Sequence, residues 1–148
     1  MSCQTESEGN FTAIPRTTLA IPPLPALMPE EVDLGEQVYI THCASCHGAN
    51  LEGEANWQEQ NDDGSFRAPP HDVSGHTWHH PDNSLFESVE RGGARFEGMN
   101  VGGTSNMPAF GEILADEEIR AVLTYIKSTW PGETRAAQWE VTVVTENQ

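Results

Sequence analysis

A Cys-x-x-Cys-His pattern at residues 43–47 sets the first condition on how this chain folds. On a helical turn, side chains three residues apart lie on the same side, so the thiols of Cys43 and Cys46 face one way. His47 follows directly, and its imidazole can contact a group that both thiols hold. The chain has 148 residues and a hydrophobic fraction of 36%, so a bound group could complete the core of a small domain with long loops.

Three kinds of site have to be compared for such a cysteine pair. C-x-x-C-H is the attachment signature of c-type haem, in which the two thiols add to the two vinyl groups of one haem and His47 ligates the iron. A thioredoxin-like dithiol would lie near a βαβ pattern, and none is visible. A structural zinc site needs four ligands, usually from a second paired motif, and the sequence has no second C-x-x-C. The pattern therefore favours one covalent haem.

Haem iron needs a second axial ligand or an open position, and four methionines are candidates. Met1 and Met28 lie towards the N-terminus, whereas Met99 and Met107 lie in a glycine-rich stretch. Met107 is followed by Pro108, which stiffens the segment that would hold a weak thioether ligand. Methionines in loops often only fill gaps in packing, but with haem accepted we expect Met107 to be the ligand, with Met99 as the alternative. His/Met ligation raises the reduction potential relative to two nitrogen ligands.

Apolar residues at helical spacing predict helices over residues 30–46, 83–91 and 116–130. Gly35 lies inside the first of these helices, where a glycine costs about 1 kcal/mol relative to alanine. We expect a packing reason for that glycine, and the close approach of another helix is the obvious one.

The ends of the later helices carry their own signals. Asp82 and Asp116 are the expected N-caps, and Gly92-Gly93 is expected to end the second helix. The long stretches between the helices hold most of the glycines and are expected to be irregular.

The two ends of the chain differ from the middle. Residues 1–29 are predicted to be a Pro-rich extended tail or tether, because closely spaced prolines oppose a helix. Residues 30–131 form the main domain, and residues 132–148 a C-terminal extension packed on it, with a strand-like run at 139–144. Cys3 is either an idle thiol or the lipid-modified first residue of a membrane-tethered lipoprotein. No apolar run reaches the roughly 18 residues of a membrane helix, and no signal peptide is visible in the polar N-terminus.

Two further stretches resemble class I c-type cytochromes, in particular the bacterial single-haem domains. Residues 106–111, NMPAFG, are similar to the loop of the distal ligand, and residues 115–128, ADEEIRAVLTYIKS, to the closing helix. The similarity covers about residues 33–130. It implies an all-α fold of three to five helices around one covalently bound haem, with long loops. The family's contact between its first and last helices would then be made by Gly35, Tyr39, Val122 and Tyr125.

The resemblance also implies how the haem is held. In the family, a proline carbonyl accepts the Nδ1–H of the proximal histidine, which fixes the ring and strengthens it as a donor. Pro69 is the residue that we favour for this role, and the leucine that usually comes two residues later is His71 here. Trp57 and Trp78 are candidates to bury the haem edge or to donate an indole N–H to a propionate.

Four histidines lie within ten residues around Trp78. Imidazoles this close together could bind copper, zinc or nickel. Alternatively, they pack near the haem, hydrogen bond to its propionates or face solvent. The sequence leaves a second metal open at these four residues, which are His71, His76, His79 and His80.

The charge of the chain restricts its partners. Seven basic and 23 acidic residues give a formal net charge of −16. Like charges repel, which rules against nucleic acid and anionic membrane surfaces as partners. Electrostatic steering favours a redox protein with a basic docking surface, although solubility alone explains the charge equally well.

Three functions are in competition. The first is a one-electron carrier with a His/Met-ligated haem c, which passes electrons between periplasmic or other extracytoplasmic partners. In this case no side chain is expected to act as a general acid or base, so we expect that the chain on its own is not an enzyme. The second is the electron-transfer subunit of a larger oxidoreductase, which would co-purify with another subunit. The third is a gas-binding or sensing haem protein, which requires an open sixth position and would bind carbon monoxide readily.

Overall fold

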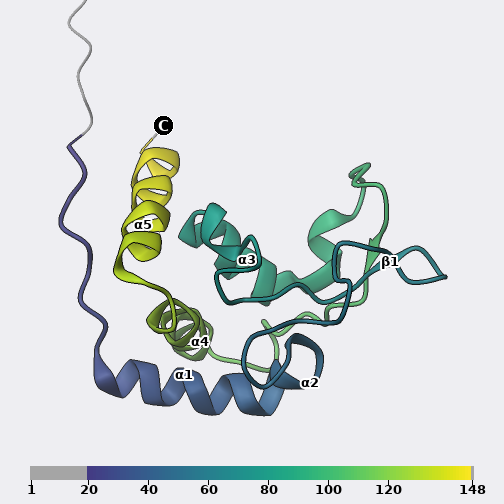
Figure 1. The fold of residues 1–148 in the computed structure, drawn as a ribbon, viewed down its shortest axis with the longest axis horizontal. Coiled ribbons are helices and arrows are strands. Elements are labelled where there is room, and N and C mark those ends of the chain that lie inside the picture. Colours follow the sequence, from purple (N-terminus) through teal and green to yellow (C-terminus); the bar gives the residue numbers. More distant parts are fainter. Residues whose placement is uncertain (1–19, 148) are drawn as a thin grey trace, which may run out of the picture.

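The computed structural model of the chain describes residues 20–147 and is mostly helical (Figure 1). The expected all-α fold class is therefore confirmed. Two short strands pair in parallel, with Ser65 opposite Thr104. The elements of the described part are, in chain order, α1 (Pro29–His42), α2 (Ala44–His47), β1 (Ser65–Phe66), the 3₁₀ turn η1 (Thr77–His79), α3 (Asp82–Arg91), the 3₁₀ turn η2 (Gly92–Phe96), β2 (Thr104–Ser105), α4 (Asp116–Ser128) and α5 (Gly132–Glu146).

Helices α1 and α4 cross in close contact, and Gly35 is where they meet. A Cβ atom at Gly35 would lie 1.9 Å from the carbonyl oxygen of Ala121, which no side chain can tolerate. The expected packing reason for this glycine is thus confirmed. Next to the crossing, the rings of Tyr39 and Tyr125 pack together, with their centroids 5.5 Å apart. This contact joins α1 to α4.

One hydrophobic core is shared by α1, α3, α4 and the loop before α4. Three side chains that the sequence selected as site candidates, Cys43, Trp78 and Met107, are partly buried against it. Its buried members are Val38, Tyr39, Leu51, Leu85, Val89, Phe110, Leu114, Ile119, Val122, Leu123, Ile126 and Trp130.

The strand-like run predicted at 139–144 is wrong, because these residues lie in the middle of α5. Valine and threonine favour strands only where a sheet offers a partner, and among residues 20–147 the one sheet consists of β1 and β2 alone. As a helix, the segment instead buries Gln138, Thr142 and Val143. Helix α5 packs on η1 and on the start of α3.

Neither expected N-cap is observed as such. Helix α3 begins at Asp82 itself, and its first two amides are accepted by side chains of α5: the Asp82 N–H by Thr142 Oγ1 at 3.1 Å and the Asn83 N–H by Glu146 Oε1 at 3.0 Å. A distant helix thus supplies the cap. Helix α4 begins at Asp116, and the Glu118 carboxylate accepts the preceding Ala115 N–H at 2.9 Å. Gly92 ends α3 with a positive φ of 52°, as expected.

The described part of the predicted tail, residues 20–28, is extended and runs beside α5 before it enters α1 (Figure 1). Two side chains of α5 hold it: Trp139 Nε1 donates to the Pro22 carbonyl at 2.9 Å and Arg135 to the Pro25 carbonyl at 3.2 Å. Cys3 lies outside the described residues. Within residues 20–147, no helix has the length and apolar character to cross a membrane.

Candidate functional site

The Cys-x-x-Cys-His pattern forms a helical turn directly after α1. The amides of Cys46 and His47 both donate to the Cys43 carbonyl, at 3.1 and 2.9 Å. Cys43 is half-buried, Cys46 is exposed, and both thiols are free. Burial, together with the neighbouring Cys46, raises the pKa of Cys43 to about 11. Two thiols and an imidazole therefore lie on one turn at the border of the hydrophobic core.

His47 is buried, and its ring is oriented by a backbone acceptor. Its Nδ1 lies 2.9 Å from the Pro69 carbonyl oxygen. A carbonyl can only accept, so Nδ1 carries the proton and Nε2 keeps its lone pair. Burial lowers the pKa of His47, and the opposing influences of the Pro69 carbonyl and Glu54 are smaller. A neutral imidazole with an unprotonated Nε2 is the form that ligates a metal.

The loop after α2 places Pro69 beside this ring. The Gly53 amide donates to the His47 carbonyl at 2.8 Å, and the Glu54 amide donates to the Ala68 carbonyl at 2.9 Å. Gly53 has a φ of +69°, and a Cβ atom there would lie 2.5 Å from the backbone nitrogen of Pro70. Only glycine permits this approach. The hydrogen bond that the resemblance implied for Pro69 thus depends on two loop segments pressed together.

His71 lies against the face of His47. The ring centroids are 4.1 Å apart with an angle of 25° between the planes. Burial, together with the adjacent His47 and His76, holds the pKa of His71 well below its ordinary value, so this ring is neutral as well. Its Nδ1 lies 2.9 Å from Thr77 Oγ1. The sequence marked His71 as a departure from the family's usual leucine and as one of four possible ligands of a second metal, and neither reading predicted this stack.

Met107 is half-buried against the core, whereas the alternative Met99 is 63% exposed. The structure therefore favours Met107 of the two. Its loop is bound to the start of η2, directly after α3: the Gly93 amide donates to the Met107 carbonyl at 2.8 Å. Further along, the Phe110 amide donates to the Val89 carbonyl at 3.1 Å.

Gly92 allows the same loop to approach. A Cβ atom at Gly92 would lie 2.4 Å from the Met107 carbonyl oxygen and 2.2 Å from that of Pro108. Sequence reasoning took this glycine only as the end of a helix. Its second role is to leave space for the backbone of the Met107 loop. The residues around Gly92 do not reveal this role, because Met107 lies fifteen residues further along the chain.

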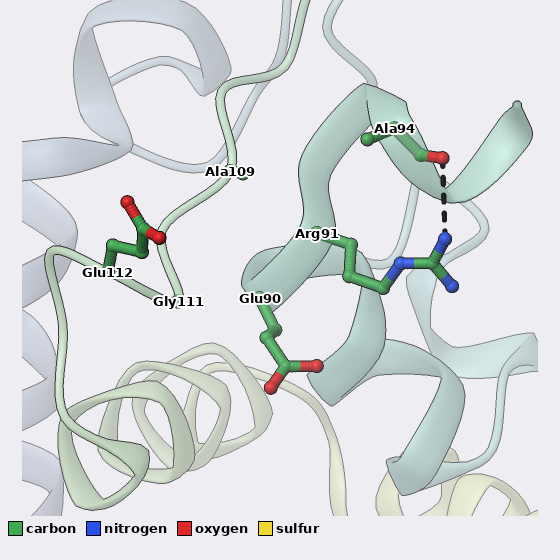
Figure 2. A pocket seen from close by; sticks show the side chains of 6 residues that line it. All are labelled: Glu90, Arg91, Ala94, Ala109, Gly111 and Glu112. Carbon is green, nitrogen blue, oxygen red and sulfur yellow. Dashed lines mark hydrogen bonds between the residues drawn. The ribbon is translucent and has the colours of Figure 1, made fainter.

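A surface pocket lies where α3 and this loop face each other (Figure 2). Neither the Cys-x-x-Cys-His residues nor Met107 line it, so it is not the candidate site. Across it, the Gly111 amide donates to the Glu90 carbonyl at 3.0 Å, a further contact that holds the loop on α3. The lining residues are Glu90, Arg91, Ala94, Ala109, Gly111 and Glu112.

The two candidate tryptophans differ in their surroundings. Trp78 is half-buried against the core, and its Nε1 is buried with no acceptor among the residues that the structure describes. Such an orphaned donor is rare in proteins and indicates a partner that the polypeptide does not supply. Trp57 packs instead against His76, with ring centroids 5.4 Å apart, and does not belong to the core. Trp78 is the better candidate for contact with a bound group.

The four histidines do not form a metal site of their own. Within residues 20–147, no group of three or more His, Cys, Asp or Glu side chains is arranged to hold a metal ion. Their rings pack on other aromatic rings instead: His71 on His47, His76 on Trp57, and His79 on Trp78 at a centroid distance of 3.7 Å. The structure therefore gives no support to the hypothesis of a second metal at these residues.

The groups present fit an iron porphyrin. Two free thiols on one turn can hold it covalently, the neutral imidazole of His47 can ligate its iron, and the thioether of Met107 is a ligand of the type found with it. The buried N–H of Trp78 needs an acceptor, which a propionate would provide. Zinc is a poorer fit, because the only paired thiols have no second pair of ligands beside them in residues 20–147.

Comparison with known proteins gives one family. The model of the family described as Cytochrome c matches residues 32–130, which include the whole turn, the Met107 loop and α4. No match to the chain was found among curated proteins or solved structures.

Proposed function

Since this chain belongs to the cytochrome c family, we propose that it passes single electrons between protein partners, with His47 and Met107 as the axial ligands of its haem. Family membership establishes the coarser part of this statement, a covalent haem c and haem-based electron transfer. The choice of ligands and partners is the part that we propose.

The buried, oriented imidazole of His47 is the observation that carries the ligand assignment. Its Nδ1–H donates to the Pro69 carbonyl oxygen, with 2.9 Å between nitrogen and oxygen, so only Nε2 remains to bind a metal. A bound haem supplies reversible one-electron chemistry at its iron. We propose no acid or base role for the side chains around it; they hold two ligands in place, keep water from the buried side and so limit structural change between the two oxidation states.

Met107 is proposed as the second ligand because it is the half-buried methionine of the pair in the glycine-rich stretch. Its backbone is held by Gly93, and Ser105 Oγ lies 3.3 Å from its amide. A fixed backbone compensates for the weakness of a thioether as a ligand. Trp78 is proposed to donate its buried N–H to a propionate of the same haem.

The partners are proposed to be redox proteins with a basic docking surface, on the grounds of the net charge of −16. Domains of this family are typically extracytoplasmic, and we propose the periplasm or an equivalent compartment. Attachment through a lipid on Cys3 stays a prediction from the sequence, since that residue lies outside the described part of the chain.

Covalent attachment and ligation can be tested together. The full chain is produced in a host with a haem-maturation system, and a pyridine haemochrome spectrum and a redox titration are recorded. We expect one covalent haem per chain that resists acid–acetone extraction, and its loss in the double variant Cys43→Ala/Cys46→Ala. Ser45→Ala, which changes an exposed residue inside the same turn, is the control. A colourless protein, or pigment that passes into the solvent, would overturn the proposal.

A further inference from the structure

Two contacts hold the ring of His47, and only one of them is the hydrogen bond to Pro69. The other is the stack with His71, at 4.1 Å between centroids and 25° between planes. A single hydrogen bond at Nδ1 restricts rotation of the imidazole about its Cβ–Cγ bond, but a hydrogen bond tolerates tens of degrees of misalignment, so the ring can still rock about that bond. A flat neighbour on its face removes this freedom.

His71 is itself held from several sides. Its amide donates to the Leu51 carbonyl at 2.8 Å, and its own carbonyl accepts the indole N–H of Trp130 at 2.7 Å. The side chain is fixed by the contact between its Nδ1 and Thr77 Oγ1 at 2.9 Å. The ring of Tyr39 stands nearly perpendicular to it, with centroids 6.4 Å apart and an angle of 76° between the planes. A group held by its backbone, its ring nitrogen and a second aromatic ring can act as a rigid wall.

We propose that His71 is a positioning residue which fixes the plane of the His47 imidazole by stacking on its face, so that the ligand presents Nε2 in one orientation. The inference rests on the proposed function, since it assumes that His47 ligates the haem iron. It goes beyond it, because neither the motif nor the hydrogen bond to Pro69 narrows the rotation of the ring to a single orientation. An aliphatic side chain at position 71 could fill the same space without offering a flat surface.

The orientation of an axial imidazole can be read from the electron paramagnetic resonance spectrum of the ferric protein at low temperature. The unmodified protein is expected to give one sharp low-field signal. His71→Leu should broaden or split this signal, because the ring of His47 then adopts several orientations. His71→Phe, which keeps a flat ring, should restore the single signal. His76→Leu is the matched control, since it makes the same change at an exposed histidine that packs on Trp57 outside the core.

The outcomes separate the two claims. If the unmodified protein carries no covalent haem, or if His47 is not a ligand, the proposed function fails. If the haem is bound and His71→Leu gives the same signal as the unmodified protein, or His71→Phe is as broad as His71→Leu, the role of His71 fails alone. Should His71→Leu not accumulate, nuclear Overhauser contacts between the two imidazoles in the reduced, unmodified protein test the stack directly. Their absence overturns the inference.

Discussion

Gly92 is the residue on which the position of Met107 depends most directly. A methyl group there would lie 2.4 Å from the Met107 carbonyl oxygen, and backbone atoms cannot yield cheaply. Gly92→Ala is therefore expected to move the loop, weaken the thioether ligand and lower the reduction potential, in the same direction as Met107→Ala. Met107→Ala should in addition open the iron to added ligands such as imidazole. Redox titration and ligand binding measure both effects.

Gly98 provides the control for backbone strain. It also has a positive φ, of 77°, but nothing lies within 4 Å of the place that its Cβ would occupy. Gly98→Ala and Gly92→Ala both place a Cβ on backbone with a positive φ, at a cost of about 1–3 kcal/mol in the free energy of unfolding, and only Gly92→Ala should change the potential. Equal potentials in the two variants would mean that the loop does not depend on Gly92.

Single residues also show how far the sequence can be interpreted. Cys43, Cys46 and His47 are adjacent, so their geometry follows from one helical turn and could be predicted. The stack of His71 on His47 could not, because the contact joins a turn to a loop 24 residues further along, and no pattern of spacing encodes it. The same holds for the buried N–H of Trp78, which has no acceptor within residues 20–147, a fact visible only in three dimensions.

At the level of elements, the sequence predicts a helix correctly where it has a stripe of apolar residues. Where it has none, the type of element is predicted wrongly. Helix α4 was predicted to within two residues at its C-terminal end. Helix α5 was mistaken for a strand because it buries polar Gln138 and Thr142 beside Val143. Such a face has no apolar periodicity, and it is specified by the hydrogen bonds that it makes with the start of α3.

Gln138 should accordingly be the most sensitive position in α5. It is 2% exposed, and its Nε2 lies 3.0 Å from the His80 carbonyl oxygen and 2.6 Å from Asp82 Oδ1. Gln138→Ala removes the amide donor from both oxygens, of which Asp82 Oδ1 keeps Lys127 Nζ as a donor, and should lower the free energy of unfolding by about 1–3 kcal/mol in urea titrations. Glu140→Ala, at an exposed position of the same helix, should change it by less than about 0.5 kcal/mol. Comparable losses in both variants would mean that α5 is not held by this network.

The whole molecule carries a net charge of −16, and its effect on electron transfer can be measured without knowing the natural partner. The probes are two small oxidants of opposite charge, cationic tris(phenanthroline)cobalt(III) and anionic ferricyanide. Because long-range attraction raises encounter rates at least about tenfold at low salt, the reaction with the cation should slow by about that factor as the ionic strength rises from roughly 0.01 to 0.5 M. The reaction with ferricyanide should accelerate over the same range, since salt screens a repulsion. Stopped-flow mixing of the reduced protein gives both rate constants. Rates that do not depend on salt for either probe would show that the charge lies too far from the site of electron exchange to steer a partner, and the net charge would then serve solubility alone.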